Sequence, residues 1–166
     1  YMSIIKYILI FLVSLGIAFF FYKKYFLAPK IAFPNLQLQN LEGESVSIDQ
    51  YLGKPVLVNF WATWCHNCLN EMADLEKASK ILKEKGIETI LISDESIETI
   101  IGFKQTKTYQ FTYLKFSGER EDLKIFSIPT TYLLNKNGEI VYTKVGEEKW
   151  AEPQIIEMLI EKAGLD

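Results

Sequence analysis

Apolar residues beyond position 35 follow two different spacings, which divide the chain into short strands and longer helices. Alternating or continuous apolar runs predict strands at residues 36–39, 45–48, 55–60, 87–92, 111–116, 130–134 and 139–145. Apolar positions three and four residues apart predict helices at residues 65–85, 97–109 and 152–163, with helical turns at 49–52 and 121–126. The strand, helix and strand over residues 55–92 form a βαβ unit with parallel strands, so the sequence predicts an α/β fold.

The longest apolar run lies near the N-terminus. Residues 7–22 are sixteen residues without a charge, and as a helix they would cover ~24 Å, slightly less than a ~30 Å hydrocarbon core. Apolar residues on both sides extend the run, and Lys6, Lys23 and Lys24 are placed to reach the lipid head groups. We therefore predict a transmembrane anchor over residues 2–27, with Met2 as the natural first residue and Tyr1 left aside.

Two other interpretations of this run stay open. A cleaved signal peptide would use the small residues Gly16 and Ala18 as its cleavage site, but three phenylalanines directly after them keep the segment apolar. A buried helix of a soluble protein is the remaining alternative. The lysines on the two sides of the run are too evenly distributed to predict its orientation in a membrane.

Residues 28–34 are predicted to be a linker. Pro29 cannot continue a helix, and the ten residues 25–34 span at most ~35 Å. Residues 35–166 are numerous enough to bury one hydrophobic core. We expect this part of the chain to be a single domain that works close to the bilayer.

Composition narrows the class of partner. The formal net charge is −3, and Arg120 is the only arginine. Because binding to phosphates requires clustered Lys and Arg, nucleic acid is not expected to bind.

The only two cysteines, Cys65 and Cys68, follow the buried strand at 55–60 and begin the helix at 65–85. Unpaired backbone N–H groups and the helix dipole favour a thiolate at such a helix start. A thiol with an ordinary pKa of ~8.5 can reach ~7 or lower there. We predict that Cys65 is the exposed attacking thiolate, and that Cys68, one turn further in, resolves the mixed disulfide.

Two non-catalytic interpretations of this pair are less favoured. A zinc site needs about four ligands, and the two cysteines with the lone His66 do not supply them. A purely structural disulfide across four residues would remove little entropy from the unfolded chain. A Cys-x-x-Cys pair beside a βαβ pattern is typical of a redox motif, and we expect neither a metal nor any other cofactor.

Residues 58–68, Val-Asn-Phe-Trp-Ala-Thr-Trp-Cys-His-Asn-Cys, resemble the active-site segment of the thioredoxin superfamily. The continuation Leu-Asn-Glu-Met at 69–72 resembles its membrane-anchored, TlpA/ResA-like branch, and matches at 128–131 and 137–139 extend the similarity over roughly residues 31–163. The resemblance implies a thioredoxin-like fold at residues 35–166, in which helices flank a central mixed β-sheet with an extra N-terminal β-hairpin. It also implies a thiol-disulfide oxidoreductase.

The resemblance assigns roles to further residues. Pro129 is expected to be cis and, with Ile128, to bind substrate by exposing backbone groups with which an extended client segment pairs. Asn59 stands where thioredoxins carry a buried aspartate, and it cannot titrate. Glu71, one helical turn after Cys68, is the expected replacement that handles the proton. The alternative for Glu71 is a solvated acid near a helix N-terminus.

The remaining candidates surround the cysteines. His66 and Asn67 separate them, and a protonated His66 would favour the Cys65 thiolate, although it can equally point into water. Trp64 is expected to contribute to an apolar docking surface for substrate. For Trp61, a place in the core agrees with the sequence at least as well as a catalytic role does.

These features predict a membrane-tethered oxidoreductase. The resemblance to TlpA/ResA-like proteins implies that its domain lies on the periplasmic or outer side of a bacterial plasma membrane, and that it reduces protein disulfides in cytochrome c maturation. Its expected partners are disulfide-bearing client proteins, a membrane thiol electron donor and, through the anchor, lipid. One alternative is a peroxiredoxin-type peroxidase, for which Thr63 is not at the required Thr-x-x-Cys spacing and Arg120 is remote. The other is a copper-handling or binding protein, which a single His and no Met cluster disfavour.

Overall fold

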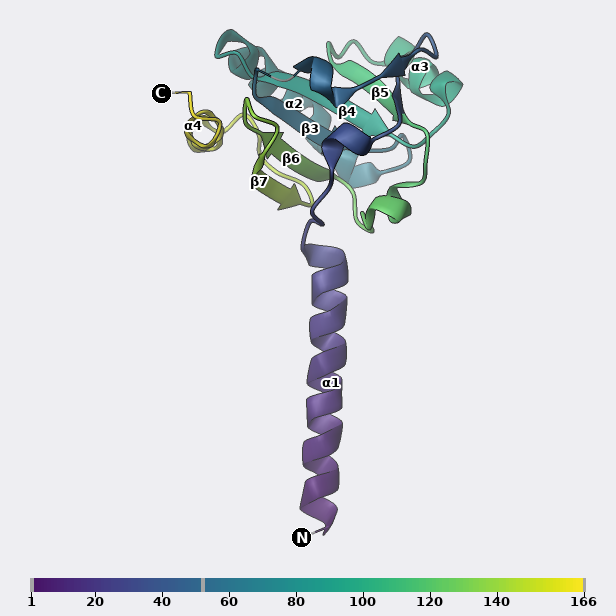
Figure 1. Cartoon of the computed structure of the whole chain (residues 1–166), viewed down its shortest axis with the longest axis vertical. Coiled ribbons are helices and arrows are strands. Elements are labelled where there is room, and N and C mark those ends of the chain that lie inside the picture. Colours follow the sequence, from purple (N-terminus) through teal and green to yellow (C-terminus); the bar gives the residue numbers. More distant parts are fainter. Residues whose placement is uncertain (1, 52, 166) are drawn as a thin grey trace.

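The computed structural model describes residues 2–51 and 53–165. Tyr1, Leu52 at the end of the expected helical turn, and Asp166 at the end of the expected domain lie outside the described residues. Figure 1 shows one folded domain mounted on a long N-terminal helix.

Within the described residues, the domain is built on one mixed sheet with the strand order β2-β1-β5-β4-β3-β6-β7. β4 pairs in parallel with β3 and β5, whereas the other neighbours are antiparallel. The fold is the expected thioredoxin-like mixed sheet, and β1 and β2 form the extra N-terminal hairpin. The strands are β1 Leu38–Gln39, β2 Ser45–Val46, β3 Val56–Phe60, β4 Glu88–Ser93, β5 Thr112–Phe116, β6 Thr130–Leu134 and β7 Ile140–Val145.

Helices cover the sheet because each presents an apolar face to it. α2 His66–Glu84 and α4 Pro153–Lys162 pack on one face, together with residues of α3 Ile97–Thr106. The opposite face is covered by short 3₁₀ helices and loops, η1 Phe33–Asn35, η2 Ile48–Tyr51 and the segment around η3 Arg120–Leu123. All five residues of β3 are buried, as expected for a strand covered on both faces.

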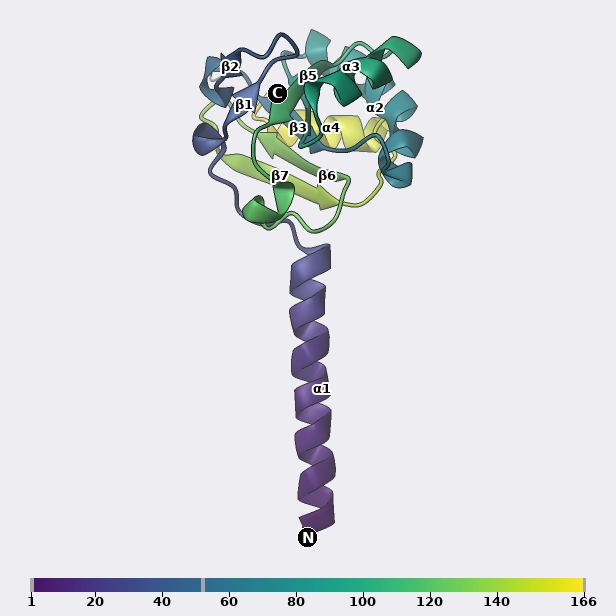
Figure 2. The ribbon, with the colours of Figure 1, turned by 90° about the vertical axis from the view of Figure 1, so that its right-hand side faces the viewer.

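The N-terminal apolar run forms α1 Met2–Phe26, which extends straight away from the domain in both views (Figures 1 and 2). Within Ile4–Phe26, a window of 18 residues has a mean hydropathy of 2.5, and none of that window is buried in the protein. By length and composition this helix is able to cross a membrane. The helix continues through Lys23 and Lys24, which the uncharged run at 7–22 did not include.

The segment expected as a linker packs against the domain. Phe33 is 2% exposed and lies against the rings of Phe60 and Tyr132. The Tyr132 hydroxyl donates a hydrogen bond to the carbonyl oxygen of Pro29 at 3.0 Å, and Ile31 is partly buried against the same core. These contacts fix the direction in which the chain leaves α1.

Candidate active site

The two cysteines lie where β3 is followed by α2. Cys65 is the N-cap residue of α2, and its Sγ accepts a hydrogen bond from the backbone N–H of Cys68 at 3.2 Å. A disulfide joins the two residues, whose Cα atoms are 5.2 Å apart. The Cys65 sulfur therefore lies at the positive end of the helix dipole, beside backbone N–H groups that have no partner within the helix.

Exposure separates the two cysteines less than expected. Cys65 is 5% exposed and Cys68 is 1% exposed. The prediction of an exposed Cys65 is wrong for this disulfide-bonded form, because the bond holds its sulfur against the buried Cys68. Cys65 nevertheless lines a surface pocket whose lining does not include Cys68.

This pocket brings together most of the substrate-binding and tuning residues that the sequence suggested. Its lining consists of Trp64, Cys65, His66, Asn67, Arg120, Phe126, Ser127 and Ile128. Trp64 is 62% exposed and offers an apolar surface directly beside Cys65, whereas Trp61 is buried in the core. The pocket thus presents one reactive sulfur together with apolar and polar groups that a client segment can contact.

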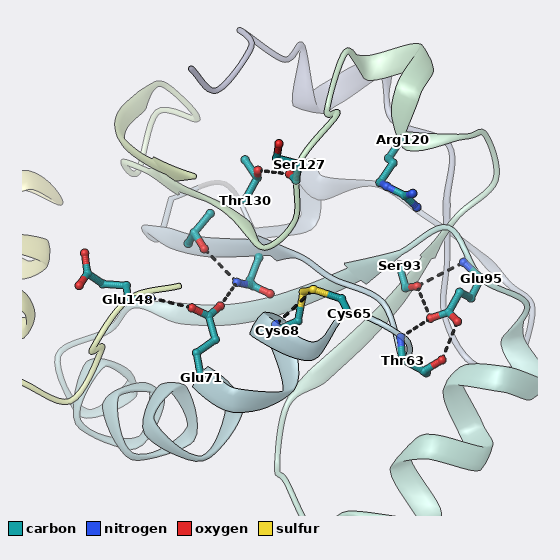
Figure 3. Close-up of a disulfide and its surroundings, with 12 residues drawn as sticks. Thr63, Cys65, Cys68, Glu71, Ser93, Glu95, Arg120, Ser127, Thr130 and Glu148 are labelled. Atoms are coloured by element: carbon teal, nitrogen blue, oxygen red, sulfur yellow. Dashed lines mark hydrogen bonds between the residues drawn. A yellow bond between two sulfur atoms is a disulfide. The ribbon is translucent and has the colours of Figure 1, made fainter. Parts of the chain in front are cut away.

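The wall of the pocket opposite α2 belongs to the loop before β6. The Ile128–Pro129 peptide bond is cis, as the resemblance implied. Thr130 Oγ1 donates a hydrogen bond to the Ser127 carbonyl oxygen at 2.6 Å (Figure 3), and the Gly146 N–H donates to the Pro129 carbonyl oxygen at 2.8 Å. These bonds hold the loop on both sides of the proline. Ile128 lines the pocket, and Pro129 is not part of its lining.

Glu71 is not a solvated surface acid, because it is only 3% exposed. Asn59 Nδ2 donates to Glu71 Oε1 at 2.9 Å and also to Thr131 Oγ1 at 2.9 Å. The backbone N–H of Glu148 donates to Glu71 Oε2 at 3.0 Å. Both carboxylate oxygens are therefore held in place, one turn of α2 beyond Cys68 (Figure 3).

Burial controls the proton affinity of Glu71. Removal from water raises the pKa of its carboxyl from 4.5 to about 7, although the hydrogen bonds from Glu148 and Asn59 oppose the rise. Glu71 lines a second pocket, together with Asp74, Glu147 and Glu148. Because the linings of the two pockets have no residue in common, the pocket beside Glu71 opens to solvent at a different place from the pocket beside Cys65.

A polar cluster that the sequence analysis missed fixes the turn before Cys65. The Glu95 carboxylate accepts hydrogen bonds from the N–H and hydroxyl of Thr63, both at 2.7 Å, and from Ser93 Oγ at 3.2 Å (Figure 3). A signal for this contact was present. Polar residues follow the strand predicted at 87–92 directly, and parallel pairing places the residues after both strands at one edge of the sheet.

Arg120 is not remote from Cys65, contrary to the expectation from its sequence position. η3 places it in the pocket lining, with its guanidinium carbon 5.1 Å from the centroid of the Trp64 ring. Arg120 Nη1 donates to both carboxylate oxygens of Asp94, at 2.9 and 2.7 Å. Asp94 therefore holds a planar cation against the exposed Trp64 ring, which restricts the orientation of that ring.

The arrangement supplies the parts that thiol–disulfide exchange requires. A sulfur at a helix N-terminus borders an open pocket, and a second sulfur within bonding distance is buried behind it. A carboxyl group with a near-neutral pKa lies one helical turn further along. Such a site can form a mixed disulfide with a second molecule and then resolve it.

Comparisons with known proteins agree with this chemistry. The model of the AhpC/TSA family matches residues 29–143. Thioredoxin-like protein YneN of Bacillus subtilis is 37% identical over 120 residues, covering 68% of this chain and 69% of YneN. Thiol-disulfide oxidoreductase ResA of Halalkalibacterium halodurans is 32% identical over 142 residues, covering 81% of each chain. The crystal structure of StoA from Bacillus subtilis, 25% identical, superposes with a TM-score of 0.61 over 76% of this chain and 98% of StoA.

Proposed function

Because the chain belongs to the AhpC/TSA family and is a thiol-disulfide oxidoreductase of the ResA and StoA type, we propose that it reduces disulfides in extracytoplasmic proteins while α1 tethers it to a bacterial plasma membrane. The observation that carries this proposal is the Cys65–Cys68 disulfide at the start of α2, beside a pocket walled by the cis-proline loop. The process we propose is cytochrome c maturation, on the strength of the resemblance to the TlpA/ResA-like branch.

The reaction begins from the dithiol form. The Cys65 thiolate attacks one sulfur of a client disulfide, which forms a mixed disulfide and releases the other client sulfur as a thiolate. Cys68 then loses its proton and attacks the Cys65 sulfur, which releases the second client thiol and closes the Cys65–Cys68 disulfide. Two electrons pass from the protein to the client, so no cofactor is needed.

The pocket positions the client for this attack. An extended client segment is proposed to pair with the backbone beside Pro129 as an added strand, while Trp64 and Ile128 provide apolar contacts. His66 and Asn67 are exposed at the start of α2. A positive charge on His66 would favour the Cys65 thiolate and make the protein a weaker reductant.

Glu71 is proposed to take the proton that Cys68 must lose. Cys68 is 1% exposed, so water reaches its thiol poorly. A carboxyl group whose pKa is raised to about 7 is well matched to proton transfer near neutral pH. Asn59 cannot titrate and holds the carboxyl group instead. The second pocket offers the proton a way to the surface that avoids the bound client.

The proposed direction of electron flow requires an electron donor in the membrane to which α1 tethers the domain. In an oxidising compartment the protein reduces clients only if a donor keeps Cys65 and Cys68 as thiols, and we propose a membrane thiol donor for this step. Rapid acid quenching of cells, followed by thiol alkylation, is expected to find most of the protein as the dithiol. A predominantly disulfide form in cells with the donor intact would indicate an oxidase instead.

Two alternative functions are tested by assays with insulin, peroxide and copper. A peroxidase would need Thr63 and Arg120 to act on a peroxide beside Cys65, but Glu95 engages the Thr63 hydroxyl and Asp94 engages the guanidinium. A copper-handling protein would bind copper in place of disulfide exchange. The reduced protein is expected to reduce insulin disulfides, and faster turnover of peroxide, or copper binding without insulin reduction, would refute the proposal.

A further inference from the structure

The C-terminal end of α1 contacts the wall of the active-site pocket. Ser127 Oγ donates a hydrogen bond to the carbonyl oxygen of Tyr25 at 2.9 Å, across 102 residues of sequence. The Tyr25 ring lies edge-on to the Phe126 ring with centroids 6.2 Å apart, and Lys24 Nζ lies 4.5 Å from the Phe126 centroid. Phe126 and Ser127 both line the pocket beside Cys65. We refer to these contacts of Lys24 and Tyr25 with Phe126 and Ser127 as the junction.

The chain that follows α1 reinforces the junction. The Pro29 carbonyl oxygen accepts a hydrogen bond from Tyr132 Oη, and Phe33 is buried against the rings of Phe60 and Tyr132. A Gly- or Ser-rich tether would let a domain sample many orientations. Here the segment after α1 is packed on the sheet, so the orientation of the domain follows that of the helix (Figures 1 and 2).

The length of α1 sets the depth of the junction. The apolar stretch Ile4–Phe26 has 23 residues and is ~34 Å long, against ~30 Å for a hydrocarbon core. With α1 spanning the bilayer as proposed above, its last turn, with Lys24 and Tyr25, lies at the boundary of the hydrocarbon. Lysine extends its ammonium group to the head groups and tyrosine is enriched at this level. Phe126 and Ser127, which contact this turn, lie in the adjoining head-group layer.

We propose that the junction presents the Cys65 pocket to the surface of the bilayer that α1 spans, and that the sulfur groups exchanged there are carried at head-group level by the same membrane. This inference rests on the proposed function, because it needs both the tether and the thiol chemistry. It adds the place of the reaction. A thiol or disulfide held in the head-group layer meets the pocket repeatedly, whereas a soluble disulfide gains nothing from the junction.

The experiment compares a lipid-linked disulfide with a soluble disulfide, both of which react by thiol–disulfide exchange. The full-length reduced protein is reconstituted in vesicles of phosphatidylcholine and phosphatidylglycerol that contain a phosphatidylethanolamine with a pyridyl disulfide on its head group. The soluble probe is 2,2′-dipyridyl disulfide. In each reaction two protein thiols become the Cys65–Cys68 disulfide, while one probe disulfide is reduced to two thiols. The lipid probe yields one pyridine-2-thione and one lipid thiol, whereas the soluble probe yields two pyridine-2-thiones. The absorbance of pyridine-2-thione, divided by the number released per reaction, gives both rates.

The test variant detaches the pocket from the anchor. It combines a six-residue Gly-Ser insertion between Leu27 and Ala28 with Tyr25→Ala, and neither change alters a residue of the pocket lining. The control carries the same insertion in the exposed turn between β1 and β2, after Glu42. We expect the ratio of the lipid-probe rate to the soluble-probe rate to fall about tenfold in the test variant and to stay at the wild-type value in the control.

The outcomes separate this inference from the function on which it rests. An unchanged or increased ratio in the test variant would overturn the proposal that the junction orients the pocket. A wild-type protein that fails to react with the soluble probe, or fails to float with the vesicles, would overturn the proposed function and this inference with it. Equal soluble-probe rates in all three proteins verify that the variants fold.

Discussion

Replacing Glu71 by glutamine removes a buried group that titrates. Glutamine has nearly the same shape, and its Oε1 can still accept from Asn59, but its amide faces the Glu148 N–H and loses that hydrogen bond. The loss costs about 1 kcal/mol and does not depend on pH. The pH-dependent part of the effect therefore reports on the proton of Glu71 alone.

The pKa of Glu71 sets the size and the sign of that part. The folded protein holds the proton up to a pKa of about 7, whereas the ordinary value of 4.5 applies to the unfolded chain. Between these values the folded state is protonated and the unfolded state is ionised, so wild-type stability falls as pH rises through this window. The shift of about 2.5 units corresponds to about 3 kcal/mol at 1.36 kcal/mol per unit. Glutamine does not incur this loss.

Urea unfolding of the full-length protein in detergent measures the effect through the fluorescence of the buried Trp61 and Trp150. The free energy of unfolding of Glu71→Gln minus that of wild type is expected to rise by about 3 kcal/mol between pH 4 and pH 8. Glu84→Gln, at an exposed position of the same helix, serves as the control. A Glu71→Gln difference that is flat with pH, or that falls, would refute the assignment of a raised pKa to Glu71.

The remaining predictions concern the cysteines, the anchor and the docking surface. Cys68→Ser is expected to accumulate mixed disulfides with clients in non-reducing gels, and trapping by Cys65→Ser instead would reverse the two roles. Protease added to intact spheroplasts is expected to remove the domain and leave a membrane stub; full protection would reverse the topology, and a soluble product beginning near Phe19 would establish cleavage. Asp94→Asn removes the buried carboxylate that holds the Arg120 cation against Trp64 and leaves the exposed Glu121 as the ion-pair partner of Arg120. We therefore expect kcat/KM to fall several-fold for insulin but not for a small disulfide, and an equal fall for both would contradict a docking role.

Much of the local architecture was predictable from residue spacing. An apolar period of two residues specifies a strand, and one of three to four residues specifies a helix, because each element must bury one face. The helix that starts at the cysteine pair, the parallel strands on either side of it and the apolar N-terminal helix all follow from such patterns. The predicted ends of the strands were less accurate. The alternation at 36–39 and 45–48 extends beyond the two-residue strands that form, because Leu36 caps η1 and Ile48 begins η2.

The site required the tertiary structure wherever a contact joins distant residues. Glu71 meets Asn59 across 12 residues and Glu148 across 77, and Ser127 meets Tyr25 across 102. Periodicity shows that an element has a buried face, but not which loops meet at its ends. Burial then decides whether an acid such as Glu71 is a solvated charge or a proton carrier. The sequence by itself determined the redox pair and the elements that hold it, whereas packing decided its proton acceptor, the orientation of Trp64 and the contact between pocket and anchor.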